Sequence, residues 1–453
     1  APHGSTMTTA EARYHPFFPK TAGNGLQGVL HVQNAGTADA TFQVDFYAEQ
    51  GAVVKRYYGT VKPGAAHALA AQAWAALPAG VYGVRVTTTN AQPLITVVRV
   101  KDTSRAVPGL GFDPGVSQSR LATTLHGGPI YGGAKASTIH LFNPTTATVN
   151  GEIVLTTLTG TPVAPRTWSL PAYGRTTITF NTQPADFVGT VQITASTATA
   201  ALLQQTIVND GLELQAFNPP ATRHFLPRVH KAVAESDGVY TTKLLISNPT
   251  ANAVSVDVSL TASEGQLPTT TVALNPNSAT FLDLRDLSGV PDGVYGAIVN
   301  STAPVVLSEI TDAINTTANA KATYAGQDLT AITQWETVGS QIFFSRAVRA
   351  DHSYSSLNLQ NSSDSEAYIT IAAYNADGTK NGSDLTDRIP AKGAKKYNRL
   401  FNVSAGFIGS IVISSDRPLV GWMDEVVLTG DEPDPAPAPI DPPAVVFLPT
   451  IWR

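Results

Sequence analysis

The feature that most constrains this chain is a sequence pattern that occurs four times. Each copy has an apolar segment ending in Asn, and the four Asn residues are separated by 109, 105 and 113 residues. A glycine follows each Asn by 17 residues, and a proline follows it by 28 or 29. The four sets are Asn34, Gly51 and Pro63; Asn143, Gly160 and Pro171; Asn248, Gly265 and Pro276; and Asn361, Gly378 and Pro390. Fixed spacing in four copies predicts four homologous domains.

The pattern between these positions predicts β-strands. Residues 41–47 and 254–260 alternate polar and apolar side chains, as strands with one buried face do. The repeated glycines suit hairpin turns, and a further glycine enters a late strand of each copy at Gly83, Gly189, Gly296 and Gly409. About seven short strands per repeat indicate an all-β chain of four tandem immunoglobulin-like β-sandwich domains with an orphan C-terminal β-strand.

The same spacing predicts the domain boundaries. We expect an N-terminal extension at 1–13, immunoglobulin-like domains at 14–118, 119–221, 222–340 and 341–430, a Pro-rich linker at 431–443 and an orphan strand at 444–453.

Each domain begins with an aromatic strand, and this strand occurs once more at the end of the chain. The first copy carries Tyr14, Phe17, Phe18 and Pro19. Equivalent segments lie at 223–228 and 341–346, with a degenerate one at 121–125. The last copy contains Val445, Val446, Phe447, Leu448, Pro449, Ile451 and Trp452. The sequence therefore contains five first strands and four domain bodies.

Two interpretations of the extra strand remain open. The Pro-rich linker is extended, so it can carry the strand to a neighbouring copy of the chain. Burying its apolar side chains would contribute on the order of 10 kcal/mol, and a head-to-tail contact that does not close makes a filament. Alternatively, the strand folds back and completes the fourth domain. Each body would then own the strand that follows it, and residues 14–20 would be the spare strand.

The composition of the chain excludes several classes of partner and of chemical site. A net charge of −5 without a basic run argues against nucleic acid and anionic membranes. The absence of cysteine excludes disulfides, thiolate metal sites and cysteine nucleophiles. No run of about 18 apolar residues is present, so we expect no membrane span. The chain opens Ala-Pro-His-Gly, as a protein does after removal of a signal peptide, and we expect an extracellular or cell-surface location.

No catalytic motif is present, and we expect neither enzymatic activity nor a cofactor nor a metal site. His31 and His140 occupy equivalent strand positions, which favours packing over metal ligation. The tryptophans Trp74, Trp168, Trp335 and Trp422 fall at different points of their repeats, which favours packing over a sugar-binding face. Acceptor sequences for N-linked glycans begin at Asn300, Asn315, Asn361, Asn381 and Asn402. The acidic residues of 431–443 are separated by prolines and indicate a solvated linker rather than a Ca²⁺ loop.

In architecture the chain resembles tandem immunoglobulin-like repeat proteins of prokaryotic cell surfaces, of the filament, sheath or surface-layer type. The resemblance implies the architecture alone. The extra strand and the low charge favour an extracellular structural protein, a stiff string of domains that self-assembles head-to-tail through a terminal strand into a homopolymer, as a filament, sheath or surface layer. Two other functions remain open at this point. One is a cell-surface adhesin or carbohydrate-binding stalk with glycan partners, and the other is an accessory region of a larger secreted enzyme.

Overall fold

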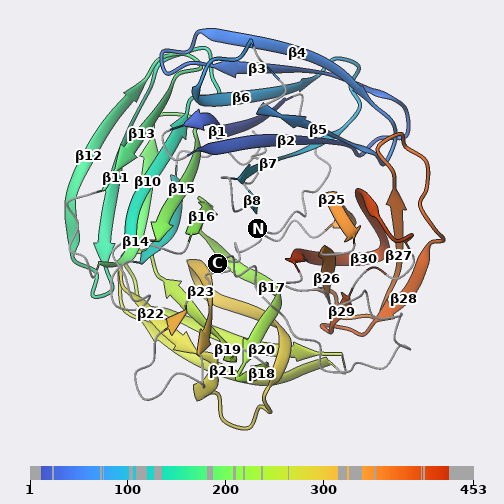
Figure 1. Ribbon diagram of the computed structural model, residues 1–453. Coiled ribbons are helices and arrows are strands. Elements are labelled where there is room, and N and C mark those ends of the chain that lie inside the picture. Colours follow the sequence, from blue (N-terminus) through green and yellow to red (C-terminus); the bar gives the residue numbers. More distant parts are fainter. Residues whose placement is uncertain are drawn as a thin grey trace.

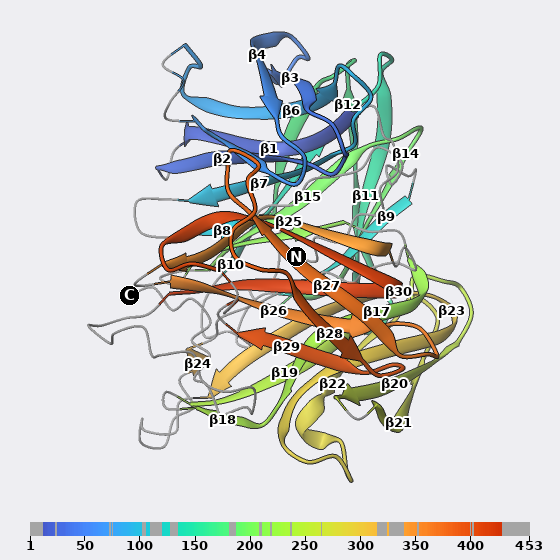
Figure 2. The same ribbon diagram turned by 90° about the vertical axis from the view of Figure 1, so that its right-hand side faces the viewer.

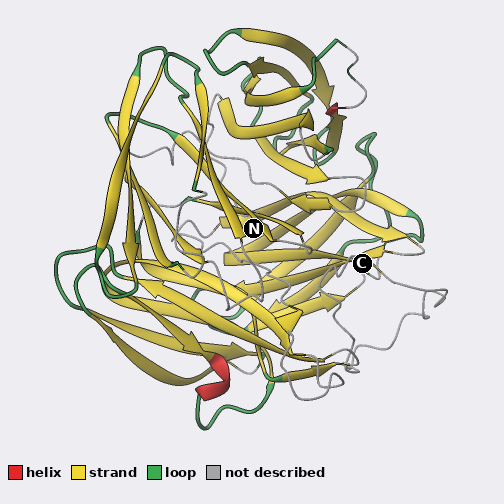
Figure 3. Ribbon diagram, turned by 60° about the vertical axis from the view of Figure 1, so that its left-hand side comes forward, coloured by secondary structure: helices red, strands yellow, loops and turns green. Residues whose placement is uncertain are grey.

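The computed structural model describes most of the chain between Ala12 and Val427. The described residues are 12–22, 25–71, 74, 76–101, 106–108, 120–126, 135–180, 187–207, 211–217, 220–235, 238–263, 265–314, 324–325, 339–350, 353–398, 400 and 403–427. They form strands almost throughout, and η4 (Leu284–Asp286) is a short 3-10 helix among them (Figure 3). The all-β class expected from the sequence is confirmed.

The strands form four sandwich units. Unit 1 contains β1 (Ala12–Ala22), β2 (Leu26–Asn34), β3 (Ala40–Tyr47), β4 (Val53–Val61), β5 (Ala66–Ala70), β6 (Gly80–Thr88), β7 (Leu94–Lys101) and β8 (Ala106–Pro108). Unit 2 contains β9 (Arg120–His126), β10 (Lys135–Phe142), β11 (Val149–Thr157), β12 (Pro162–Leu170), β13 (Arg175–Thr179), β14 (Val188–Ala195), β15 (Ala200–Ile207) and β16 (Gly211–Ala216).

The other two units follow the same order. Unit 3 contains β17 (Ala221–Lys231), β18 (Val233–Glu235), β19 (Gly238–Ser247), β20 (Val254–Ala262), β21 (Gly265–Leu274), β22 (Ala279–Asp283), η4, β23 (Gly293–Ile314) and β24 (Tyr324–Ala325). Unit 4 contains β25 (Gly339–Ala350), β26 (Ser353–Asn361), β27 (Ala367–Tyr374), β28 (Leu385–Ile389), β29 (Ala394–Asn398) and β30 (Phe407–Val427).

Every unit has the same two-layer topology. In unit 1 the two layers have the orders β4-β3-β6-β1 and β5-β2-β7-β8, and the end of β1 also pairs with β2, which joins the layers into one eight-stranded sheet. Unit 2 repeats this order with β12-β11-β14-β9 and β13-β10-β15-β16. In units 3 and 4 the sixth and seventh strands are continuous, so β23 and β30 each cross from one sheet to the other. The sandwich prediction is thereby confirmed.

The strand order shares its centre with the immunoglobulin fold and differs at its edges. With the strands lettered A to G along the chain, the sheets here are D-C-F-A and E-B-G. Antibody constant domains pair the strands as ABED and CFG. The C–F and B–E pairs are common to both, whereas strand A here joins strand F and strand G joins strand B.

Each core lies between the two sheets of its own unit. In β3, whose alternation predicts one buried face, Phe42, Val44 and Phe46 are at most 1% exposed. The central cluster of each unit consists mainly of strand residues of that unit, and Leu202 of unit 2 also packs on the cluster of unit 1. Burying a large apolar side chain contributes about 1.5–3 kcal/mol, so the four cores stabilise the four sandwiches.

The four units form a closed ring rather than the extended string expected from the sequence. In Figure 1 they follow one another around a common centre, and in Figure 2 the fourth unit lies between the first and the third. The ring closes because unit 4 contacts unit 1: Gln33 Nε2 donates to Ile411 O at 3.3 Å, and Ser410 Oγ donates to Gly64 O at 2.7 Å. A head-to-tail contact repeated at the right angle closes into a ring, which is why a string of these units does not stay open.

Candidate assembly surfaces

The repeated Asn closes the same polar turn in every unit. All four Asn side chains are completely buried. In unit 2, Asn143 Nδ2 donates to Ala147 O at 2.7 Å and to Pro171 O at 2.8 Å, while its Oδ1 accepts from Thr145 N. One amide thus joins the loop after the second strand to the proline turn between the fourth and fifth strands. Because a short polar side chain that bonds its own backbone two residues on defines an Asx turn, the Asn at this position is structural.

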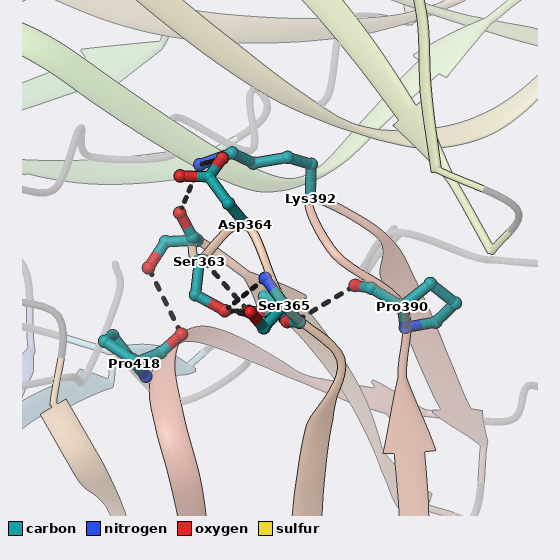
Figure 4. Close-up of polar contacts among 8 residues, drawn as sticks. Ser363, Asp364, Ser365, Pro390, Lys392 and Pro418 are labelled. Carbon is teal, nitrogen blue, oxygen red and sulfur yellow. Dashed lines mark hydrogen bonds and ion pairs between the residues drawn. The ribbon is translucent and has the colours of Figure 1, made fainter.

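Figure 4 shows this turn in unit 4, where Ser363 and Ser365 lie beside the turn that contains Pro390 and Lys392. Ser363 Oγ donates to Ser365 O at 2.8 Å, and Lys392 Nζ pairs with Asp364 at 3.0 Å. Asn361 Nδ2 donates to Pro390 O at 2.9 Å. Since its amide is buried and fully engaged, the acceptor sequence beginning at Asn361 is not accessible for glycosylation in the folded chain.

The proline turn and the glycine hairpin of successive units meet at each of the four contacts between units, which we term seams 1–2, 2–3, 3–4 and 4–1. Arg175 N of unit 2 donates to Glu49 O of unit 1 at 3.0 Å, and Ala279 N of unit 3 donates to Leu158 O of unit 2 at 2.9 Å. At seam 4–1 the corresponding turns place Gly64 against the ring of Tyr374.

The residue that precedes the repeated Asn reaches across the seam in every unit. At seam 3–4, Gln360 Nε2 donates to Thr261 Oγ1 at 3.0 Å and to Ala297 O at 3.3 Å. At seam 2–3, Ser247 Oγ bonds Thr190 Oγ1. Gln33 makes the equivalent contact at seam 4–1, and at seam 1–2 the position is taken by Phe142. The residue before the repeated Asn therefore contacts the neighbouring unit in all four repeats, although its side chain differs among them.

Two of the repeated strand glycines show why the position excludes a side chain. A Cβ atom on Gly83 would lie 2.3 Å from the ring of Phe142 across seam 1–2. A Cβ atom on Gly296 would lie 2.8 Å from the Cβ of Ala394 across seam 3–4. The sequence showed these glycines at fixed spacing, and the structure gives their reason: the neighbouring unit packs directly on the backbone.

The N-terminal strand predicted as a counterpart of the terminal strand belongs to unit 1. β1 pairs with β6, with Tyr14 opposite Arg85 and Pro19 opposite Val81. Phe18 is completely buried in the core, 5.1 Å from Phe46 between ring centroids. Its neighbour Phe17 faces the other way and stacks on His140 of unit 2 at 4.1 Å. This strand therefore fills its own sandwich and also contacts the next unit.

In all four units the aromatic strand that precedes the body of the domain is the first strand of that unit's own sandwich. β9, β17 and β25 pair with β14, β23 and β30 as β1 pairs with β6. The interpretation in which each body owns the following strand, with residues 14–20 as the spare, is therefore wrong. Val445, Val446, Phe447, Leu448, Pro449, Ile451 and Trp452 lie outside the described residues, as does the linker 431–443.

The two histidines at equivalent strand positions are packing residues of the seams. His140 Nε2 lies 2.7 Å from Gln204 Oε1, and burial lowers the pKa of His140 to about 3. Burial, together with the charges of Arg346 and Arg99, lowers the pKa of His31 to about 3. Both imidazoles are therefore neutral at pH 7. Among the described residues, no group of three or more His, Asp or Glu side chains is arranged to hold a metal ion.

The described tryptophans also pack inside the molecule. Trp168 and Trp422 are 7% and 6% exposed, and Trp74 lies against Phe46 at 4.8 Å between ring centroids. Trp335 lies outside the described residues. No helix in the described part of the chain is long and apolar enough to cross a membrane.

The chain belongs to DUF5719, a family of unknown function whose model matches residues 134–384. The matched region begins in unit 2 and ends in unit 4, so it crosses the boundaries of the repeats. No curated protein matches the sequence significantly.

Three solved structures show weak similarity. Protein 1070 of Thermotoga maritima is 19% identical and matches 26% of this chain and 96% of its own, with a TM-score of 0.22. The Anabaena sensory rhodopsin transducer is 18% identical over 20% of this chain and 100% of its own, with a TM-score of 0.18. A tetra-tandem repeat from the extending region of a large adhesion protein is 12% identical over 88% of this chain and 93% of its own, with a TM-score of 0.11. Scores at this level do not define a shared fold.

Proposed function

We propose that this chain is an extracellular structural protein that assembles head-to-tail into a filament, sheath or surface layer. In this assembly each copy is a closed ring, and the C-terminal strand of one copy pairs with a neighbouring copy.

One observation carries the proposal. The sequence contains five first strands, and β1, β9, β17 and β25 already occupy the first-strand positions of all four sandwiches. The fifth strand, Val445–Trp452, has no equivalent position left within its own chain. An additional apolar strand that finds no place in these four sandwiches would favour pairing with another molecule.

The ring supports the same function. Its four seams are satisfied within one chain, so the turns that form them are not available to link one copy to the next. A link between rings must therefore use another element. The Pro-rich linker of 13 residues extends about 40 Å at the rise of polyproline II, enough to reach a neighbouring ring.

The test compares the full chain with two altered forms. One ends at Pro443, and the other carries Phe447→Asp and Leu448→Asp in the full-length chain. Negative-stain electron microscopy and light scattering should show polymers for the unaltered chain and single rings for both altered forms, because a buried carboxylate opposes strand pairing. Circular dichroism melting checks that the rings remain folded.

Polymers from all three forms, or single rings from all three, would overturn the proposal. If removal of the tail instead lowers the melting temperature of a single ring, the strand belongs to its own chain. A monomeric stalk or adhesin would then be the better explanation.

A further inference from the structure

The four outer edge strands of the ring differ in how well they are protected against pairing with another strand. The fourth strand of every unit, β4, β12, β21 or β28, ends its four-stranded sheet among the described strands. In Figure 1 these strands lie on the periphery of the ring. A free edge presents unpaired backbone donors and acceptors, so proteins normally protect it with prolines, charges or short length.

Three of the four edges are protected by prolines or by short length. β12 contains Pro162 and Pro165, and β21 contains Pro268. β28 is only five residues long and carries Asp387 and Arg388. Proline cannot donate to an added strand, and a short charged strand offers little surface to pair with.

β4 has neither of these features, and only its two charged residues, Lys55 and Arg56, oppose pairing; Arg56 is already paired with Asp45 at 2.6 Å. The strand is nine residues long, contains no proline and has the sequence Val-Val-Lys-Arg-Tyr-Tyr-Gly-Thr-Val. Val53, Val54 and Tyr58 are 44%, 37% and 63% exposed. They make up three of the six large hydrophobic side chains exposed in the described part of the chain. A long, proline-free edge with exposed apolar side chains is the kind of surface to which another strand adds.

The terminal strand of a second copy matches this edge in length, and the linker that precedes the strand is opposite in charge to β4. Residues 445–453 are nine in number and apolar except for Thr450 and Arg453. β4 carries Lys55 and Arg56 and no acidic residue, whereas the linker 431–443 carries four acidic residues and no basic one. Pro449 is tolerated in an added strand because that strand becomes the new edge of the sheet.

We propose that β4 of one ring is the acceptor for the terminal strand, Val445–Arg453, of another ring. This inference rests on the proposed function, because it names the partner surface of the same assembly. One donor strand and one acceptor edge per chain give a head-to-tail polymer in which every ring has two neighbours.

Cysteine cross-linking tests the contact directly, because the chain has no cysteine of its own. A chain with Tyr58→Cys is mixed under oxidising conditions with a chain carrying either Phe447→Cys or Leu448→Cys, positions that face opposite sides of a strand. Val163→Cys on β12, the equivalent strand of unit 2, is the matched control. A disulfide-linked dimer with Tyr58→Cys and none with Val163→Cys is the expected result.

A charge substitution then separates this inference from the function on which it rests. The variant carries Val54→Lys together with Tyr58→Lys. Both side chains are exposed, so we expect the variant to fold. The double variant should weaken assembly in light scattering by at least about tenfold, because a charge replaces buried apolar contact. Val163→Lys should leave assembly unchanged.

The outcomes are distinguishable. If deletion of the tail abolishes polymers while the β4 variant still polymerises, or if the tail cysteines link equally well to β12, the acceptor lies elsewhere and the inference is overturned while the proposed function stands. If the unaltered chain forms no polymer and no cross-link, both are overturned.

Discussion

Seams 1–2 and 4–1 use the same positions of the repeat and different chemistry. At seam 1–2, Phe142 packs with Tyr14 and Tyr47 at centroid distances of 5.9 and 5.7 Å, and Phe17 stacks on His140. At seam 4–1 the position of Phe142 is taken by Gln33, which bonds backbone oxygen atoms on both sides. The apolar contact there is a smaller cluster that contains Phe343 and Ile95.

The difference corresponds to how the two seams are connected. Units 1 and 2 follow each other in the chain, whereas units 4 and 1 are held together by contacts alone. Seam 4–1 is therefore the place where the ring can open without stretching a linker. A polar closing seam loses less apolar burial on opening than an aromatic one, so we expect seam 1–2 to add stability and seam 4–1 to govern whether the ring stays closed.

The largest expected effect is at seam 1–2. Phe142→Ala removes a completely buried ring and should lower the free energy of unfolding by about 3–5 kcal/mol. Phe343→Ala at seam 4–1 is the matched change and should cost about 1 kcal/mol less, because Phe343 has no aromatic partner in its cluster. Urea unfolding followed by circular dichroism measures both. An equal or larger cost at Phe343 would contradict the comparison.

The turns were predictable from the sequence because local geometry dictates them. Gly51, Gly160 and Gly378 adopt φ values of 84, 88 and 86°, which only glycine reaches without strain, so the same residue recurs at the same spacing. The Asn turn recurs for the same reason, since one amide must satisfy several backbone groups.

The ring was not predictable in the same way. Gln33 and Gln360 share a side chain, but Phe142 and Ser247 have the same role with different chemistry, so the equivalence of the four positions does not show as a motif. Closure also depends on the angle between successive units, which no single residue encodes. The one available signal was the strand glycine of each repeat, because an invariant small residue on a strand marks close approach of another backbone.

The second effect is acid sensitivity. His140 and His31 have a pKa of about 3 in the folded chain, below the ordinary value of 6.5. The folded state therefore binds fewer protons than the unfolded state between these values, and the stabilisation present above pH 6.5 is lost as the pH falls toward 3. At pH 4.5 each histidine should lower the free energy of unfolding by about 3 kcal/mol relative to neutral pH, and His140→Gln or His31→Gln should each flatten the pH dependence of unfolding.

Protonation of the two histidines should weaken different seams. Arg346 of unit 4 contributes to the lowered pKa of His31, so opening seam 4–1 relieves the repulsion that a protonated His31 would feel. Small-angle X-ray scattering at pH 4.5 should show an expanded ring before unfolding, and His31→Gln should suppress this expansion more than His140→Gln. Equal suppression by both variants would mean that acid does not act on the closing seam.

The smallest expected effect comes from one type of substitution made at two seams: seam 4–1, which closes the ring, and seam 3–4, whose units are consecutive in the chain. Gln33→Ala and Gln360→Ala remove the same side chain from equivalent positions at seams 4–1 and 3–4. Each should lower the free energy of unfolding by about 1 kcal/mol, because each loses the hydrogen bonds that its side-chain amide donates at the seam. Only Gln33→Ala should also produce concentration-dependent dimers in size-exclusion chromatography. A unit 4 released from its own unit 1 can dock on the unit 1 of another chain, whereas at seam 3–4 the connecting segment keeps the two partners together. Dimers from Gln360→Ala, or from neither variant, would show that the missing covalent connection does not distinguish the closing seam from the other three.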